Sequence, residues 1–225
     1  MSHNFKKRLI TSILLLIILF ICIFINNILF GLSLLILSFI VCLEFNNILK
    51  KFVGSLYSSS AKFNIKFFIL MWIPFLYMFF VFSLFSYEIY RLEGPIFFLF
   101  IISICFSTDI GGYVFGKIIG GKKLTKISPN KTISGSIGSF MFSLLPIFIF
   151  SKLNNFQFEL NLNNVILSLL ISLICQFGDL FISYLKRKIK IKDTGELLPG
   201  HGGILDRVDG IIFAVPFSYI LIKIF

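Results

Sequence analysis

The feature of this sequence that most constrains its fold is a succession of long apolar stretches separated by short polar segments. Of its 225 residues, 57% are hydrophobic and 14% are charged, and the mean hydropathy is +0.98. Ordinary globular domains contain about 25% charged residues, and a soluble domain of this size could not bury so much apolar surface. The sequence therefore predicts an all-α, polytopic integral membrane protein.

A bilayer crossing takes about 17 to 25 apolar residues. We expect about seven crossings, near residues 9–25, 28–49, 65–86, 95–119, 132–151, 163–185 and 207–225. The first stretch has a basic start but no small-x-small cleavage site, which favours a membrane helix over a signal peptide. The sequence shows no internal repeat or low-complexity linker. It therefore predicts one membrane domain over 1–225, with N-terminal helices in 1–94 and the part that carries the polar motifs in 95–225.

The basic residues predict the orientation of these crossings. With the N-terminus inside, eighteen Lys and Arg fall on the cytoplasmic side and three, Arg91, Lys152 and Lys223, on the other. The net charge of +11 then reflects membrane topology and not nucleic-acid binding. We expect a multi-pass protein of the cell inner membrane, with a cytoplasmic N-terminus and active site. The four Cys lie inside apolar stretches, which is typical of small buried residues.

All five aspartates lie in or beside the two most basic loops. Membrane topology does not require acids there, so their position needs a chemical explanation. In the stretch 163–185 and just beyond it, the polar residues recur at steps of four and three, which places them on one helix face. They are Ser172, Gln176, Asp179, Ser183 and Lys186. A charged Asp inside a membrane costs about 2.5–3.5 kcal/mol. Asp179 is therefore expected either to face a wet cavity and a cation, which we favour, or to pair with a neighbouring helix.

Three further aspartates are candidates for a role beside Asp179. Asp206 and Asp209 are three residues apart and would share one face at the start of the last helix, where the helix dipole also favours acids. With Asp179 they would form a carboxylate cluster suited to Mg²⁺ and substrate phosphates. His201 could bind metal, donate to phosphate or pack the loop, and no Cys or second His lies near it to make zinc plausible. Asp109 precedes Gly112, Gly116 and Gly120, a small-residue face for close helix packing, and we favour a functional role for this Asp.

Two loops carry the features of anion sites. The segment PGHGG allows close backbone approach to a ligand, although it lacks the Walker pattern and would also suit a plain tight turn. Ser128 and Pro129 resemble a helix cap and first helical residue, so Lys131 and Thr132 would lie in a first turn able to bind an anion. The alternative is an ordinary basic loop before a membrane helix. Together, these residues indicate phosphoryl or nucleotidyl transfer between a soluble nucleotide and a lipid.

The segment SYLKRKIKIKDTGELLPGHGGILDRVD, residues 183–209, resembles the signature of the phosphatidate cytidylyltransferases, also called CDP-diacylglycerol synthases. GDLFIS upstream, and TDIGGY and SPNKT earlier, resemble the other motifs of that family in the same order. The resemblance covers residues 103–215, and the N-terminal third resembles the family only in hydropathy. Where the family usually continues with Trp-Glu-Gly, this chain has Ile133, Ser134 and Gly135. The signature residues matched are Ser183, Lys186, Arg187, Lys192, Asp193, Pro199, His201, Gly202, Gly203, Asp206, Arg207 and Asp209.

This resemblance implies the reaction of CTP with phosphatidic acid to give CDP-diacylglycerol and pyrophosphate, with Mg²⁺ and room for a second cation, in phospholipid biosynthesis. Asp179, Asp206 and Asp209 would hold the metal. Lys186 and His201 would complete the catalytic set. The substrate-binding set would be Lys131, Thr132, Ser128, Arg187, Lys192, Asp193, Gly202, Gly203, Arg207 and Asp109. The implied partners are CTP, phosphatidic acid, the bilayer and a second copy of the chain, with no nucleic acid.

Three other functions are compatible with parts of the pattern. Another lipid-phosphate nucleotidyltransferase or a polyprenol-type kinase would use the same site chemistry. A transporter would place Asp109 and Asp179 along an ion path, but the sequence lacks paired broken helices in two halves. A catalytically inactive scaffold would not need the full set of acids.

Overall fold

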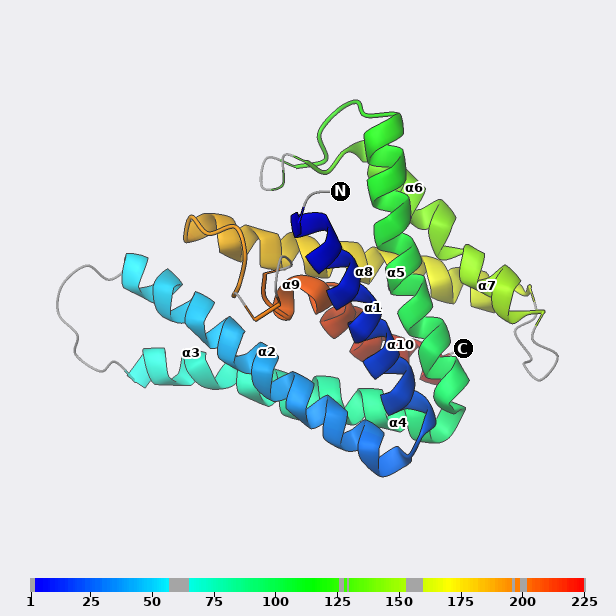
Figure 1. Ribbon diagram of the computed structural model, residues 1–225, viewed down its shortest axis with the longest axis horizontal. Helices are drawn as coiled ribbons and strands as arrows, with labels where there is room; N and C mark the ends of the chain where they lie inside the picture. Colours follow the sequence, from blue (N-terminus) through cyan, green and yellow to red (C-terminus); the bar gives the residue numbers. More distant parts are fainter. Residues whose placement is uncertain are drawn as a thin grey trace. The chain divides into compact units, whose positions relative to one another are not determined.

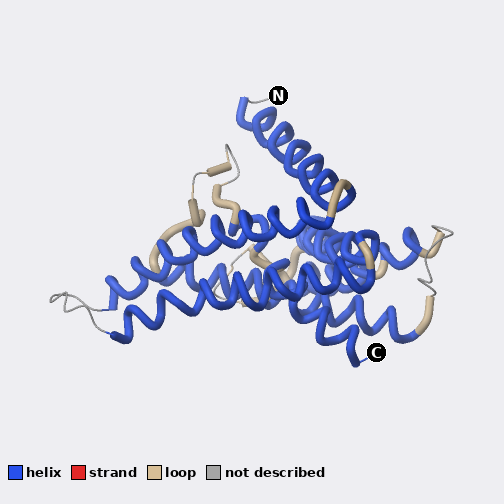
Figure 2. Tube along the Cα trace, turned by 90° about the horizontal axis from the view of Figure 1, so that it is seen from below, coloured by secondary structure: helices blue, strands red, loops and turns tan. Residues whose placement is uncertain are grey.

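The computed structural model describes residues 3–56, 65–125, 128, 130–152, 160–195, 197–198 and 202–224. Over these residues the secondary structure is helical apart from two isolated β-bridges (Figure 2). Within them, five spans are long and apolar enough to cross a membrane, and a shorter apolar helix covers Ile10–Phe24. These spans are Asn27–Phe52, Met71–Glu93, Pro95–Ile118, Ile133–Phe150 and Leu162–Lys188. The predicted all-α, polytopic membrane protein is confirmed.

The helices are labelled in chain order in Figure 1. Their bounds are α1 His3–Phe24, α2 Asn27–Leu56, α3 Ile65–Leu76, the π-helix η1 Tyr77–Phe82, α4 Ser83–Glu93, α5 Pro95–Ile118, α6 Ile133–Ser143, α7 Leu145–Phe150, α8 Leu162–Lys188, α9 Leu205–Val208 and α10 Ile211–Ile224. They fall into two compact units. Unit 1 comprises Met1–Tyr87 and Leu185–Val208, and unit 2 comprises Glu88–Tyr184 and Asp209–Phe225.

In unit 1, α2 packs along the continuous run of α3 and η1 (Figure 1). Pro74 lies inside α3 and has no N–H to donate to the preceding turn. The chain then widens into the π-helix, at whose end the N–H of Ser83 donates to the carbonyl of Met78. The Met78 carbonyl also accepts from the hydroxyls of Ser83 (3.0 Å) and Ser38 (3.2 Å). These side-chain bonds fix α2 against the π-helix inside an apolar environment.

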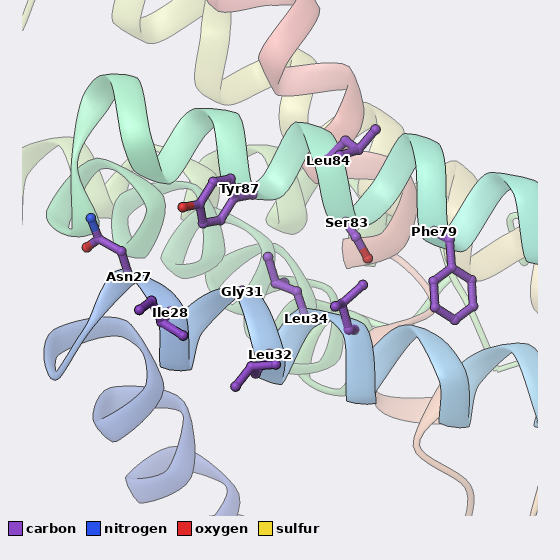
Figure 3. Close-up of a pocket in the computed structure, with 10 residues that line it drawn as sticks. Asn27, Ile28, Gly31, Leu32, Leu34, Phe79, Ser83, Leu84 and Tyr87 are labelled. Atoms are coloured by element: carbon purple, nitrogen blue, oxygen red, sulfur yellow. The ribbon is translucent and has the colours of Figure 1, made fainter.

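A groove of about 340 Å³ lies in unit 1 between the first half of α2 and the η1–α4 run. Figure 3 shows Leu32 and Leu34 of α2 on one side and Phe79 and Leu84 on the other, with Asn27 and Tyr87 at one end. Its lining is almost entirely apolar, and it contains none of the predicted site residues.

Unit 2 is built on the close contact of α5 and α6. A Cβ atom added at Gly111 would meet the Gly138 carbonyl and lie 2.6 Å from Phe142 Cβ. One added at Gly112 would lie 2.7 Å from Ser139 Oγ. Gly116 adjoins Thr132 and Gly135 in the same way. The predicted role in close helix packing is therefore confirmed for Gly112 and Gly116.

The same contact covers the small-residue face from within the chain. The face of Gly112 and Gly116 is covered by α6 of the same chain, so it gives no support to a homodimer, which remains a prediction. Gly120 lies beyond the end of α5 with φ of 63° and no atom within 4 Å of an added Cβ, so it belongs to the turn and not to the packing face.

Replacement of Gly111 by Ala should lower the stability of unit 2, because the new methyl group would collide with the backbone carbonyl of Gly138. Overpacking of this kind costs about 1–3 kcal/mol. Gly31→Ala on α2 is the matched control, since its added Cβ would meet Tyr87 at an ordinary 3.5 Å and Ala favours the helix. Thermal unfolding in detergent micelles measures both. Equal midpoints for the two variants would contradict the packing account.

Candidate active site

In unit 1, Asp206 of α9 lies within hydrogen-bond distance of four donors. Its Oδ1 accepts from Lys186 Nζ at 2.8 Å, and its Oδ2 accepts from the N–H of Thr194 (2.7 Å), the hydroxyl of Thr194 (3.1 Å) and the N–H of Gly203 (3.0 Å). The side chains of Lys186 and Asp206 are 11% and 7% exposed, so this ion pair is largely removed from water. We call Lys186, Thr194, Gly203 and Asp206 the Asp206 cluster.

These partners decide the charge of Asp206. Burial by itself would raise the pKa of this carboxyl group, but the hydrogen bond from Lys186, the Thr194 and Gly203 amides and the Lys186 charge outweigh it and lower the pKa below 3.8. Asp206 is therefore a carboxylate at neutral pH. The same contacts explain why the chain needs an acid here, three residues after Gly203.

The loop around the Asp206 cluster has the geometry expected for a glycine-rich motif. The N–H of Leu198 donates to the carbonyl of Gly202 at 2.9 Å, and the two residues pair as an isolated bridge. Gly202 has φ of 85°, and a Cβ there would lie 2.9 Å from Asp206 Oδ2 and 3.1 Å from Asp193 Cβ. Glycine is required at this position both by its backbone conformation and by the space that the carboxylate takes. Glu196, Pro199, Gly200 and His201 lie outside the described residues, so the predicted role of His201 stays a prediction.

Glu44 of α2 also belongs to this environment, and sequence reasoning did not select it. Its carboxylate is buried (4% exposed) and accepts from Thr194 Oγ1 (3.0 Å), Ile204 N–H (3.0 Å) and Leu205 N–H (2.8 Å). Glu44 is the only acidic residue between Asn27 and Phe52, a candidate membrane span. An isolated acid in an apolar helix was the signal that could have identified it.

In unit 2, Asp179 of α8 forms an ion pair with Lys131 and accepts from Ser183 Oγ at 3.2 Å. The side chains of Lys131 and Asp179 are 27% and 29% exposed, so this pair is accessible to water. Asp109 of α5 is close enough to interact electrostatically with both. We call Asp109, Lys131, Asp179 and Ser183 the Asp179 cluster. The cation that Asp179 meets in this structure is the side chain of Lys131, and its role in binding a metal ion or a substrate stays a prediction.

The start of α6 differs from the prediction. The cap is Thr132, whose Oγ1 accepts from the N–H of Gly135 at 3.1 Å, and the helix begins at Ile133. Ser128 is not the cap, because its carbonyl accepts from Lys131 N–H in a turn before the helix. Lys131 and Thr132 therefore precede the first helical turn instead of forming part of it. Lys123 also pairs with Thr132 as an isolated bridge, so Thr132 is in extended backbone before the helix.

The last predicted span is also divided. Asp206 lies in the short helix α9, whereas Asp209 lies in the turn before α10, so the two do not share a helical face. The carboxylate of Asp209 accepts from the N–H of Gly210 at 2.9 Å, a local bond that competes with helix continuation. Gly210 then starts α10 by accepting from Phe213 and Ala214.

The other predicted residues are placed as follows. Arg187 donates to the carbonyl of Ile191 at 3.3 Å, and Lys192, Asp193 and Arg207 are exposed. Within the described residues, no group of three or more Asp, Glu, His or Cys is arranged to hold a metal ion. Two of the carboxylates are paired with lysines, Asp179 with Lys131 and Asp206 with Lys186.

Comparison with known proteins assigns these motifs. The profile of the cytidylyltransferase family matches residues 48–225. The chain belongs to the cytidylyltransferase family. A metal cofactor is consistent with this membership. The Asp206 cluster and the Asp179 cluster both lie within the matched residues, whereas Glu44 lies before them.

Three relatives in this cytidylyltransferase family show the extent of the similarity. A phosphatidate cytidylyltransferase of Staphylococcus aureus is 44% identical over 144 residues, which cover 62% of this chain and 53% of that protein. Proteins of the same name from Helicobacter pylori and Bacillus subtilis are 40% and 42% identical over 134 and 123 residues, covering 59% and 54% of this chain and 48% and 45% of theirs. The chain spans about half the length of the curated relatives it matches.

Replacement of Asp206 by Asn should destabilise the protein at neutral pH, because it leaves Lys186 buried without its counter-charge, at a cost of about 3–5 kcal/mol. The folded-state pKa of Asp206 is depressed, so its stabilisation is complete above pH 3.8 and is lost as the pH falls through the folded value. The difference in unfolding midpoint between wild type and variant should therefore shrink below pH 3.8.

Thermal unfolding in detergent over a pH series provides this measurement. Asp193→Asn, a change of an exposed aspartate on the same loop, is the control and should alter the midpoint little at any pH. A difference for Asp206→Asn that stays constant into the acid range would contradict the assigned charge state.

Proposed function

We propose that this protein is a phosphatidate cytidylyltransferase, which transfers the cytidylyl group of CTP to phosphatidic acid and releases pyrophosphate. The observation that carries the proposal is the water-accessible ion pair of Lys131 and Asp179 beside Asp109, within the residues matched by the family. The names of the relatives support the choice of nucleotide and lipid.

The reaction requires two anions to meet. A lipid phosphate oxygen attacks the α-phosphorus of CTP, a new P–O bond forms, and the bond to the β-phosphate oxygen breaks as pyrophosphate leaves. Most of the catalysis is therefore charge neutralisation and alignment. Lys131 is suited to binding a phosphate because its ion pair with Asp179 is accessible to water. A substrate phosphate can therefore replace the Asp179 carboxylate as the partner of the ammonium group. Arg187, Lys192 and Arg207 are exposed cations that would add to phosphate binding.

Lys186 differs from Lys131 because it is buried. In the Asp206 cluster its ammonium group is held by a carboxylate that itself has three further donors. This pair has a defined position before any substrate arrives. We propose that Lys186 presents fixed positive charge to a phosphate and that Asp206 keeps it in place.

The donor set also fits Mg²⁺, which prefers a few carboxylates together with water and phosphate oxygens. Asp179 fits best, since its carboxylate is accessible to water and a metal ion could replace the ammonium group of Lys131 as its partner. Asp209 would be a second ligand. Asp206 would have to exchange one of its four donors for the ion, so its role as a ligand stays a prediction. Bound Mg²⁺ would neutralise triphosphate charge and the leaving pyrophosphate.

We also propose that the catalytic loops and the N-terminus face the cytoplasm of a bacterial inner membrane. Support comes from the eighteen basic residues on that side of the predicted topology against three on the other. This orientation would give the site access to soluble CTP while the lipid substrate stays in the bilayer.

The test is release of pyrophosphate by purified protein in detergent with CTP, Mg²⁺ and phosphatidic acid. Wild type should require all three. Asp179→Asn should lower the rate by about 100-fold or more, as expected when a group that stabilises transition-state charge is removed. Chelation of divalent ions should abolish the reaction reversibly.

Ser168→Ala is the matched control on the same helix α8. Its hydroxyl is buried and has no hydrogen-bond partner among the described residues, so its loss should leave the rate unchanged. Retained activity in Asp179→Asn would remove Asp179 from the catalytic set. Release with another nucleotide, and none with CTP, would overturn the proposed substrate.

A further inference from the structure

Glu44 connects α2 to the loop that carries the signature residues. It lies before residue 48, where the match to the family begins. Its partners Thr194, Ile204 and Leu205 lie 150 to 161 residues later in the sequence. All of them belong to unit 1, in which α2 packs against α9.

The loop is shaped around the Glu44 carboxylate. A Cβ atom at Gly195 would lie 2.9 Å from Glu44 Oε1, and one at Gly203 would collide with Glu44 Oε2 and Thr194 Oγ1. Two glycines on opposite sides of the loop therefore leave the space that this side chain fills. The second glycine of the His-Gly-Gly motif is needed for this reason, although Gly203 has no positive φ.

Thr194 links Glu44 to Asp206. Its hydroxyl oxygen lies 3.0 Å from Glu44 Oε2 and 3.1 Å from Asp206 Oδ2. A hydroxyl group has one proton and can donate to only one of the two carboxylates at a time. The position of the Thr194 side chain therefore depends on that of Glu44. Because Thr194 contacts Asp206, and Asp206 contacts Lys186, the positions of these two residues depend on Glu44 as well.

We propose that Glu44 is a positioning residue for the proposed reaction: it fixes the loop through Thr194, Ile204 and Leu205 so that Lys186 and Asp206 are held ready for the nucleotide phosphates. The proposal rests on the function proposed above. Glu44 itself touches no reacting atom. A carboxylate is favoured because the buried N–H of Leu205 and the half-buried N–H of Ile204 need acceptors, and leaving them unpaired is costly.

The kinetic test compares Glu44→Gln and Glu44→Leu with wild type in the pyrophosphate assay. Gln keeps one carbonyl acceptor, whereas Leu keeps the approximate volume and removes every acceptor. The KM for CTP should rise from wild type to Glu44→Gln and further to Glu44→Leu. The rise for Glu44→Leu should be about tenfold, which corresponds to a loss of about 1.4 kcal/mol in binding. The KM for phosphatidic acid should stay constant. A variant that only reduced the fraction of folded protein would lower the apparent kcat and leave the KM for CTP unchanged.

Ser38→Ala is the matched control, since it removes a buried hydrogen bond from the same helix without touching the loop. It should leave the KM for CTP unchanged. An equal rise in Ser38→Ala, or no rise in Glu44→Leu, would overturn the proposal.

A double-mutant cycle tests the path through Thr194. Thr194→Val and Glu44→Leu should each raise the KM for CTP by about tenfold. The double variant should also raise it by about tenfold, and not by about a hundredfold, because both changes break the same hydrogen-bonded link. Additive effects would overturn the role assigned to Thr194.

Hydrogen exchange separates failure of this inference from failure of the proposed function. If wild type releases no pyrophosphate with CTP and phosphatidic acid, the reaction is wrong, but exchange at the Ile204 and Leu205 amides can still be followed. Glu44→Leu should accelerate it by at least about tenfold and Ser38→Ala should not. Unchanged exchange in Glu44→Leu would overturn the positioning role whatever the substrates are.

Discussion

The arrangement of the signature loop depends on one buried carboxylate, that of Asp206. A charged group removed from water must be paired and hydrogen-bonded, or it neutralises. Asp206 meets this requirement with a lysine, a hydroxyl and two backbone amides, all from residues 186–203. The need to satisfy one side chain thus fixes the positions of Lys186, Thr194 and Gly203 together. Residues of the signature that look separate in the sequence are therefore parts of one hydrogen-bonded structure.

A different constraint organises unit 2, where the backbones of α5 and α6 approach closely through glycines. Without side chains between them, polar groups can reach across: Ser139 Oγ donates to the Thr108 carbonyl at 2.8 Å, and Ser136 Oγ donates to Gln176 Oε1 of α8 at 2.6 Å. These bonds hold the start of α6 in place, and with it Lys131. The Asp179 cluster is accordingly placed by small and hydroxyl residues that have no part in the chemistry.

The two clusters differ in exposure, and this difference supports the division of roles proposed for them. The Lys186–Asp206 pair is about one-tenth exposed, whereas the Lys131–Asp179 pair is more than one-quarter exposed. A buried pair is fixed before substrate binds, and an accessible pair can be replaced by a phosphate or a metal ion at little cost. Helix α8 contributes to both, since it carries Asp179 and Ser183 and ends with Lys186 and its two basic neighbours.

The sequence by itself determined the membrane class and the approximate helices, because hydrophobic length is a local property. Charged residues in or beside apolar stretches, together with the motifs, made Asp109, Lys131, Asp179, Lys186 and Asp206 candidate site residues. The tertiary structure decided the cap of α6, the break between Asp206 and Asp209, and the contacts of Glu44. In each case, side chains bind backbone groups or residues far away in the chain: Thr132 binds Gly135, Asp209 binds Gly210, and Glu44 binds a loop 150 residues later. Hydrophobic periodicity carries no information on such bonds, since it records which residues avoid water and not which donor each buried acceptor meets.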